Sequence, residues 1–242
     1  MIGTILNVAG ILVGGCVGLA GRKSLSAANE SFFKVTLAAA TVFCGLRLTW
    51  LSFSGSFTHV LKQFLIVLLA LTLGKLTGRL LQLQRMSNWL GRQARDRIAN
   101  ATPDAPHRFS EGFKTCTALF CAAPLGILGS IQEGLSLSRD FYALGVKAVI
   151  DGLAAMGFVS LFGRGVLLSA VPVLAVQGTL TLVCERLLEP FLSAHDLLAP
   201  VNAAGGLLIF SVALVMLGLK RIELADYLPS LAVAPLLTWL WR

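Results

Sequence analysis

The chain has 242 residues, of which 56% are hydrophobic and only 13% are charged. A composition this apolar, with a mean hydropathy of +0.79, excludes an ordinary soluble domain. The formal net charge of +8 would suit a nucleic-acid partner, but most Lys and Arg residues lie between apolar segments or at their ends. Lipid headgroups and membrane topology explain that placement, so we expect the lipid bilayer as a partner and no nucleic acid.

Long apolar runs without strict alternation predict membrane-spanning helices, because lipid offers no hydrogen bonds to an open backbone. We therefore predict an all-α, polytopic membrane helix bundle of about eight spans, forming a single integral membrane domain over residues 1–242. We expect no cleaved signal peptide, since Arg22 and Lys23 follow the first apolar run and no basic residue precedes it. The predicted spans are 2–20, 35–53, 63–83, 113–131, 142–162, 166–183, 201–218 and 225–241.

Two of these spans have irregular features. The third carries Lys75 and Arg79 near its end, and the fourth contains Pro124, Gly126 and Gly129. Either span can be shorter or broken, which would change the count. Between them, residues 85–110 form the only substantial polar connection, for which we expect a short basic interfacial helix and a linker, with a solvated loop as the alternative.

The basic residues favour one orientation in the bacterial inner membrane. If the N-terminus is outside, the outer side holds only four basic residues, Lys62, Arg139, Arg186 and Arg242. The positive-inside rule therefore predicts N-out and C-out. The cytoplasmic basic residues are then Arg22, Lys23, Lys34, Arg85, Arg92, Arg95, Arg97, Arg108, Lys114, Arg164, Lys220 and Arg221.

The first three and last three spans show an internal similarity. Identities in membrane helices are common by chance, but five crossings separate the first span from the sixth, so the two units would have opposite orientations. We expect an inverted repeat of residues 1–84 and 165–242 around a central pair of spans in 111–164. At one constant offset, Val8, Val13, Gly15 and Leu19 align with Val171, Val176, Gly178 and Leu182.

Charged residues at bilayer depth are costly, so Lys147 and Asp151 inside the fifth span are the first candidates for a binding site. They lie one helical turn apart and can simply neutralise each other. Alternatively, Asp151 exchanges a proton or a sodium ion during transport while Lys147 modulates it or replaces the ion.

Four further polar residues are candidates for substrate or ion binding. Asn7 and Gln177 either tie helices together or coordinate a cation or solute through their amide oxygens. Ser130 lies near Pro124, which frees backbone carbonyls. Glu133 follows the fourth span as an outer gate carboxylate or as a solvated loop acid.

Glycines four residues apart predict close helix contacts, either within the protomer or in a homodimer, rather than a pore lining. They are Gly10, Gly14 and Gly18 in the first span and Gly74 and Gly78 in the third.

Little in the chain indicates catalysis. The three histidines lie in different parts of the sequence, and the five cysteines lie in apolar segments without metal-ligand spacing. We expect no enzyme, no catalytic residues, no metal and no cofactor.

An ordered series of motifs runs along the chain, at residues 3–7, 109–113, 119–124, 127–134, 147–152, 177–178, 205–208 and 228–229. This series resembles the bacterial YqgA-like membrane proteins, known as domain of unknown function 554. The resemblance covers nearly the whole chain and implies a multi-pass inner-membrane protein, but it carries no established activity. Lys75 departs from the pattern, which puts the inner end of the third span in question.

Two functions remain open. The leading one is a small secondary transporter or channel that moves an unidentified small solute or ion through a site near the midplane, between the inverted repeats. The alternative is a non-transporting scaffold or assembly partner whose buried polar residues only specify packing. In a transporter, polar side chains from both units and the middle spans should converge on one hydrated cavity, whereas a scaffold should bury them in separate dry contacts.

Overall fold

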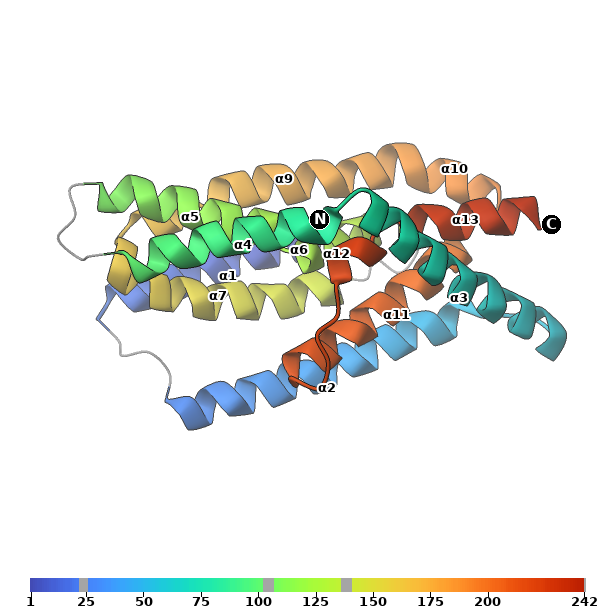
Figure 1. Cartoon of the computed structure of the whole chain (residues 1–242), viewed down its shortest axis with the longest axis horizontal. Coiled ribbons are helices and arrows are strands. Elements are labelled where there is room, and N and C mark those ends of the chain that lie inside the picture. Colours follow the sequence, from blue (N-terminus) through green and yellow to red (C-terminus); the bar gives the residue numbers. More distant parts are fainter. Residues whose placement is uncertain (22–25, 102–106, 136–140, 242) are drawn as a thin grey trace.

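The computed structural model describes residues 1–21, 26–101, 107–135 and 141–241. Four basic residues used for the predicted orientation, Arg22, Lys23, Arg139 and Arg242, lie outside these ranges. Within them every regular element is helical, which confirms the all-α bundle (Figure 1). The helices are α1 (Ile2–Leu19), α2 (Ala27–Ser52), α3 (Phe57–Leu80), α4 (Leu83–Ala99), α5 (Arg108–Ala122), α6 (Pro124–Leu135), α7 (Tyr142–Phe162), α8 (Gly165–Leu168), α9 (Ala170–Val183), the π-helical turn η1 (Cys184–Leu188), α10 (Glu189–Ala194), α11 (Leu198–Met216), α12 (Leu224–Tyr227) and α13 (Ser230–Leu240).

In the described part of the chain, six helical segments are long and apolar enough to cross a membrane: α1, α2, α3, α7, the run α8–α10 and α11. The pair α5 and α6 adds a seventh if it is one broken span, bent by 54°. The last apolar segment, Leu224–Leu240, is as long as the predicted eighth span, but it is shorter than any of these six segments and is interrupted between α12 and α13. A multi-pass helical protein is therefore supported, whereas eight crossings are not confirmed.

The break in the fourth predicted span occurs at Pro124, the first residue of α6. Ala123 before it has an extended conformation, with φ −63° and ψ 122°. This is the conformation that a following proline favours, because its ring crowds the preceding residue out of the helical region. α6 also continues to Leu135, beyond the predicted end of the span at residue 131.

The predicted basic helix is present as α4, so the alternative of a solvated loop is wrong for this part of the connection. α4 starts after Gln82, which has a positive φ of 55°, and packs against α5 and α12. The Gln84 side chain anchors its start by accepting a hydrogen bond from Ala225 N, while Gln84 N donates to Asp226. The departure at Lys75 does not interrupt α3, and the Lys75 ammonium lies 5.0 Å from the centre of the Tyr227 ring.

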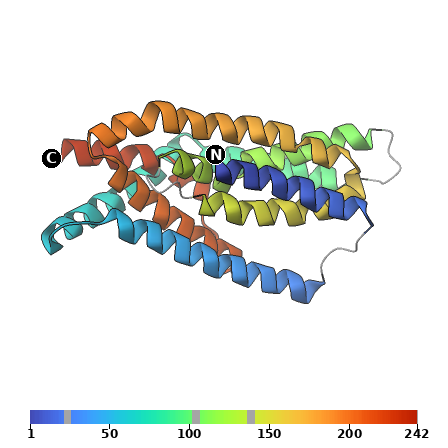
Figure 2. The ribbon, with the colours of Figure 1, turned by 180° about the vertical axis from the view of Figure 1, so that it is seen from behind.

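The helices form two groups that meet at α6. Figure 1 and, from behind, Figure 2 show α1, α5, α7 and α9 together in one half of the bundle and α2, α3, α11 and α13 in the other. α6 contacts α1, α5, α7, α9, α11 and α12. This short helix is therefore placed to carry side chains into both halves.

The glycine faces make close helix contacts within one chain, as predicted for packing. Methyl groups on Gly10, Gly14 and Gly18 would overlap backbone atoms of α7, and those on Gly74 and Gly78 would overlap Ser230 and Asp226. A homodimer would therefore need other surfaces, because these faces are already occupied.

We predict that Gly14→Ala destabilises the protein, because its methyl group would overlap the Gly152 carbonyl oxygen on α7. Overpacking of this kind costs about 1–3 kcal/mol, which exceeds the roughly 1 kcal/mol that alanine adds to helix propensity. Thermal unfolding in detergent would measure the difference. Gly157→Ala is the control, because nothing lies within 4 Å of a methyl group there. Equal melting temperatures for the two variants would contradict a close α1–α7 contact.

Candidate functional site

The candidate site is a cluster of polar side chains around α6. This helix has buried residues on all sides, since α1, α5, α7, α9 and α11 surround it. A polar side chain on α6 therefore enters the protein interior whichever way it points, and it needs a partner there.

The ion pair of Lys147 and Asp151 lies on the side of α7 that faces this interior. Lys147 is 1% exposed and Asp151 is 6% exposed, and the ammonium donates a hydrogen bond to the carboxylate one turn further on. Opposite them α6 has Gly126, where a Cβ atom would lie only 2.7 Å from Lys147 Cε. The glycine therefore leaves the space that the long lysine side chain fills.

Asn7 and Gln177 join α1 to α9 beside this pair. Asn7 Nδ2 donates to Gln177 Oε1 over 3.1 Å, and Asn7 also interacts with the Asp151 carboxylate. Gln177 Nε2 would lie 3.0 Å from a Cβ atom on Gly126, so the amide and the lysine share one small space. Within the described ranges, Asn7 Oδ1 and Gln177 Nε2 are buried without a hydrogen-bond partner.

Glu133 lies within α6 and is buried, so the alternative of a solvated loop acid is wrong. Its carboxylate accepts hydrogen bonds from Gly3 N at 2.6 Å and from Thr4 N and Oγ1 at 3.3 Å each. The Met1 amino group lies 3.2 Å away. The first turn of α1 thus holds the carboxylate, as expected for an anion near backbone N–H groups at a helix start.

Ser130 belongs to the same cluster. Its hydroxyl donates to Gly126 O over 2.9 Å, and its carbonyl oxygen accepts a hydrogen bond from Thr181 Oγ1 over 3.3 Å. Thr181 Oγ1 in turn lies 3.5 Å from Thr4 Oγ1. Polar contacts therefore run from Glu133 through the two threonines to the Ser130 backbone.

All six residues chosen from the sequence thus lie around one junction of α1, α6, α7 and α9. Sequence reasoning missed Thr4 and Thr181, although helical spacing could have found them. Thr4 precedes Asn7 by three residues and Thr181 follows Gln177 by four, so each shares a face with a chosen amide. The junction combines buried hydrogen-bonding atoms that have no partner among the described residues with two opposite charges.

The fold and this buried polar centre define a multi-pass helical membrane protein. The chain belongs to the family described as a protein of unknown function (DUF554), whose model matches residues 2–239, which confirms the resemblance found in the sequence. It is 26% identical over 236 residues to the "Uncharacterized membrane protein YdfK" of Bacillus subtilis (strain 168), covering 97% of this chain and 94% of that protein. It is 26% identical over 244 residues to the "Uncharacterized protein YqgA" of Escherichia coli (strain K12), covering 100% and 97%. No solved structure matches the chain.

The buried ion pair gives a prediction about stability. Lys147→Met alone should destabilise the protein by about 3–5 kcal/mol, because it leaves the Asp151 charge without compensation in the interior. The double variant Lys147→Met/Asp151→Leu should recover most of that loss. Unfolding of the purified variants in detergent would measure both effects.

A matched control exists on α2, where Lys34 and Glu30 form a second pair four residues apart, at 2.7 Å but on the surface. Lys34→Met/Glu30→Gln should change stability little, because exposed pairs contribute little. If the single variant Lys147→Met were as stable as the double variant, the buried charges would not be coupled.

Proposed function

We propose that the protein is a small-solute or ion transporter of the bacterial inner membrane, with its site at the junction of α1, α6, α7 and α9. The observation that supports this is the meeting of Asn7, Lys147, Asp151 and Gln177, from three helices, in one occluded cluster with unpaired polar atoms. Buried ionisable residues in membrane helices mark solute and ion pathways more often than not.

In this proposal Lys147 and Asp151 exchange partners during transport. In the closed arrangement each side chain neutralises the other, so the empty site carries no net charge from this pair. A cation or proton that reaches Asp151 releases Lys147, and an anionic group that binds Lys147 releases Asp151. Either event alone leaves one net charge in the site. Binding of a cation at Asp151 together with an anionic group at Lys147 opens the ion pair and keeps the loaded site neutral, which keeps the cost of occlusion low.

The arrangement of the helices supports an inverted repeat as part of the proposal. Antiparallel contacts join α1 to α9, α2 to α11 and α3 to α13, which are the three pairs expected to correspond. In α1 and α9, Thr4 lies beside Thr181 and Asn7 bonds to Gln177, so the residue numbers rise in one helix as they fall in the other.

The α2–α11 crossing adds a second point of support. The offset that aligns Val8 with Val171 makes Leu208 the counterpart of Gly45. Gly45 contacts backbone atoms of Gly206 and Phe210, which flank that position. A crossing at equivalent residues is the arrangement that a local two-fold axis through the crossing point produces, and inverted repeats are related by such an axis.

A scaffold remains the second candidate, because one observation favours it. The close backbone contacts at Gly10, Gly14 and Gly18 and the complete burial of the polar cluster are also what a rigid assembly partner needs. Transport activity decides between the two.

Transport should be measurable as capacitive current, or as a change in luminal pH, in proteoliposomes exposed to sodium, proton and small-solute gradients. We expect a signal from the native protein that is abolished by Asp151→Asn and by Lys147→Met/Asp151→Leu, because both remove the exchanging charge. The surface variant Lys34→Met/Glu30→Gln should keep the native signal. Silence of the native protein under all gradients would favour the scaffold, and an unchanged signal in both buried-pair variants would place the pathway elsewhere.

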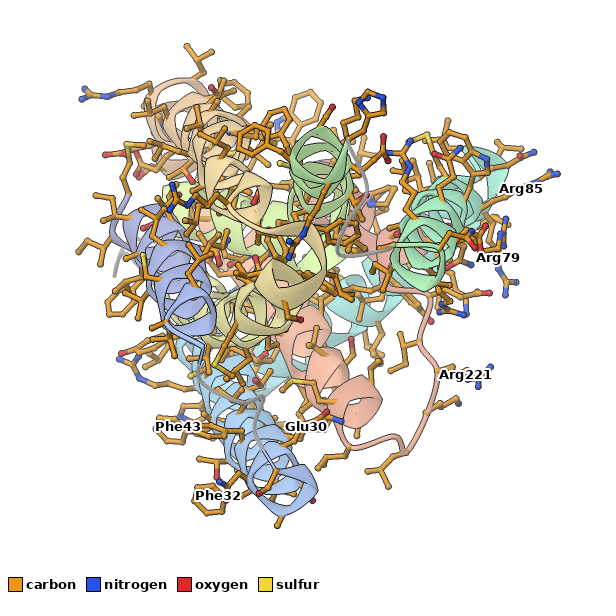
Figure 3. The ribbon with its side chains drawn as sticks, turned by 90° about the vertical axis from the view of Figure 1, so that its left-hand side faces the viewer. Glu30, Phe32, Phe43, Arg79, Arg85 and Arg221 are labelled. Atoms are coloured by element: carbon orange, nitrogen blue, oxygen red, sulfur yellow. The ribbon has the colours of Figure 1, made fainter. Side chains whose placement is uncertain are left out.

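The proposed orientation is N-out and C-out. The C-terminal ends of α1, α4 and α7 gather at one end of the bundle, while the ends of α2 and α10 lie at the other (Figure 1). Viewed from the first end, Arg79, Arg85 and Arg221 point outward, as Phe32 and Phe43 do from α2 (Figure 3). Apolar residues that point outward from α2 fit a protein inserted along this axis.

Labelling with a membrane-impermeant maleimide tests this orientation in a variant without its native cysteines. Cysteines at Ser54 and Ser193, at the outer ends of α2 and α10, should react in intact cells. A cysteine at Asn100, after α4, should react only after lysis. The same side for all three positions would contradict both the orientation and the inverted repeat.

A further inference from the structure

A second buried polar group lies on another side of α6, facing α11 rather than the transport junction. Gln132 is 0% exposed, and its side-chain amide lies against Gly205, where a methyl group would overlap it. Among the described residues neither Gln132 Oε1 nor Nε2 has a hydrogen-bond partner. A buried amide left unpaired at both ends costs several kcal/mol by order of magnitude, which points to an occupant of the space beside it.

Asn202 provides a second unpaired oxygen nearby. It precedes Gly205 by three residues on α11, so the two share a helix face, and it is 7% exposed. Asn202 Oδ1 is buried and has no partner within the described ranges. On the neighbouring face, Gly206 lies against Thr49 of α2, whose hydroxyl hydrogen-bonds to Gly45 O and Ala203 O. The two amides therefore lie where α6 and α11 meet, next to α2.

The chemistry of these groups selects the occupant. Two amide oxygens without a donor suit a cation, and the absence of a carboxylate on either side chain disfavours a divalent one, since calcium and magnesium sites are built on Asp and Glu. Gln132 is in the last turn of α6, where the helix dipole is negative, which raises the affinity of the position for positive charge.

We propose that Gln132 and Asn202 bind a monovalent cation, with sodium as the probe, at a site separate from the transport junction. Binding of the cation is independent of the proposed function, whereas its use as a coupling ion rests on that function. Because α6 carries both Gln132 and Glu133, a cation at Gln132 and a solute at the transport junction would act on the same short helix.

The test is the melting temperature of the purified protein in nanodiscs, titrated with sodium chloride, potassium chloride or choline chloride at constant ionic strength. We expect a saturable rise with sodium or potassium over choline, since a ligand that binds only the folded state stabilises it. Gln132→Met and Asn202→Leu should each remove that rise. Gln93→Met, on the surface of α4, should keep it.

Gln132→Glu tests whether the other variants lose the sodium effect only because they unfold, because glutamate keeps the shape of the glutamine side chain and adds a negative charge. It should shift the sodium titration to lower concentration. Equal melting curves in all three salts for the native protein, or an undiminished rise in Gln132→Met, would overturn the proposal. The variant Lys147→Met/Asp151→Leu should lose transport but keep the sodium effect, so failure of the transport proposal and failure of the cation site are distinguishable.

Discussion

The structure depends on one backbone interruption, the break between α5 and α6. Pro124 has no N–H to continue the α5 helix, and its ring holds Ala123 in an extended conformation, so the chain turns by 54°. The turn places a helix of 12 residues in the middle of the bundle, in contact with helices of both halves. A straight helix through this segment would remain within one half, and the polar residues of α6 would not reach both.

The buried charges at this centre are compensated in two different ways. Lys147 and Asp151 compensate each other on one helix turn, so α7 brings its own neutral pair into the interior. Glu133 instead accepts hydrogen bonds from backbone N–H groups at the start of α1. The first solution can exchange partners, because both members are side chains that can move. The second fixes α6 against α1, because backbone groups do not leave without unwinding a helix turn.

The sequence predicted the polar residues of the junction better than the lengths of the spans. Lys147 and Asp151 were found because charge inside an apolar run is costly. Asn7 and Gln177 were chosen separately, and only the tertiary structure reveals their mutual hydrogen bond, since nothing local specifies which helices meet. The predicted 225–241 span is not one continuous helix, because hydropathy does not register the interruption between α12 and α13. Gln132 was passed over because the fourth span was predicted to end at residue 131, whereas α6 continues to Leu135.

The glycine contacts determine which parts of the bundle move together. α1 and α7 touch through backbone atoms at Gly10 and Gly14, and α2 and α11 touch in the same way at Gly45 and Gly206. Backbone atoms packed this closely do not slide past one another without overlap, so each pair behaves as a rigid unit. α6 instead meets α7 and α9 through the side chains of Lys147 and Gln177, which can change rotamer. Because Glu133 holds α6 to α1, the proposed transport would change access to the junction by movement of the α2–α11 pair relative to α1, α6 and α7.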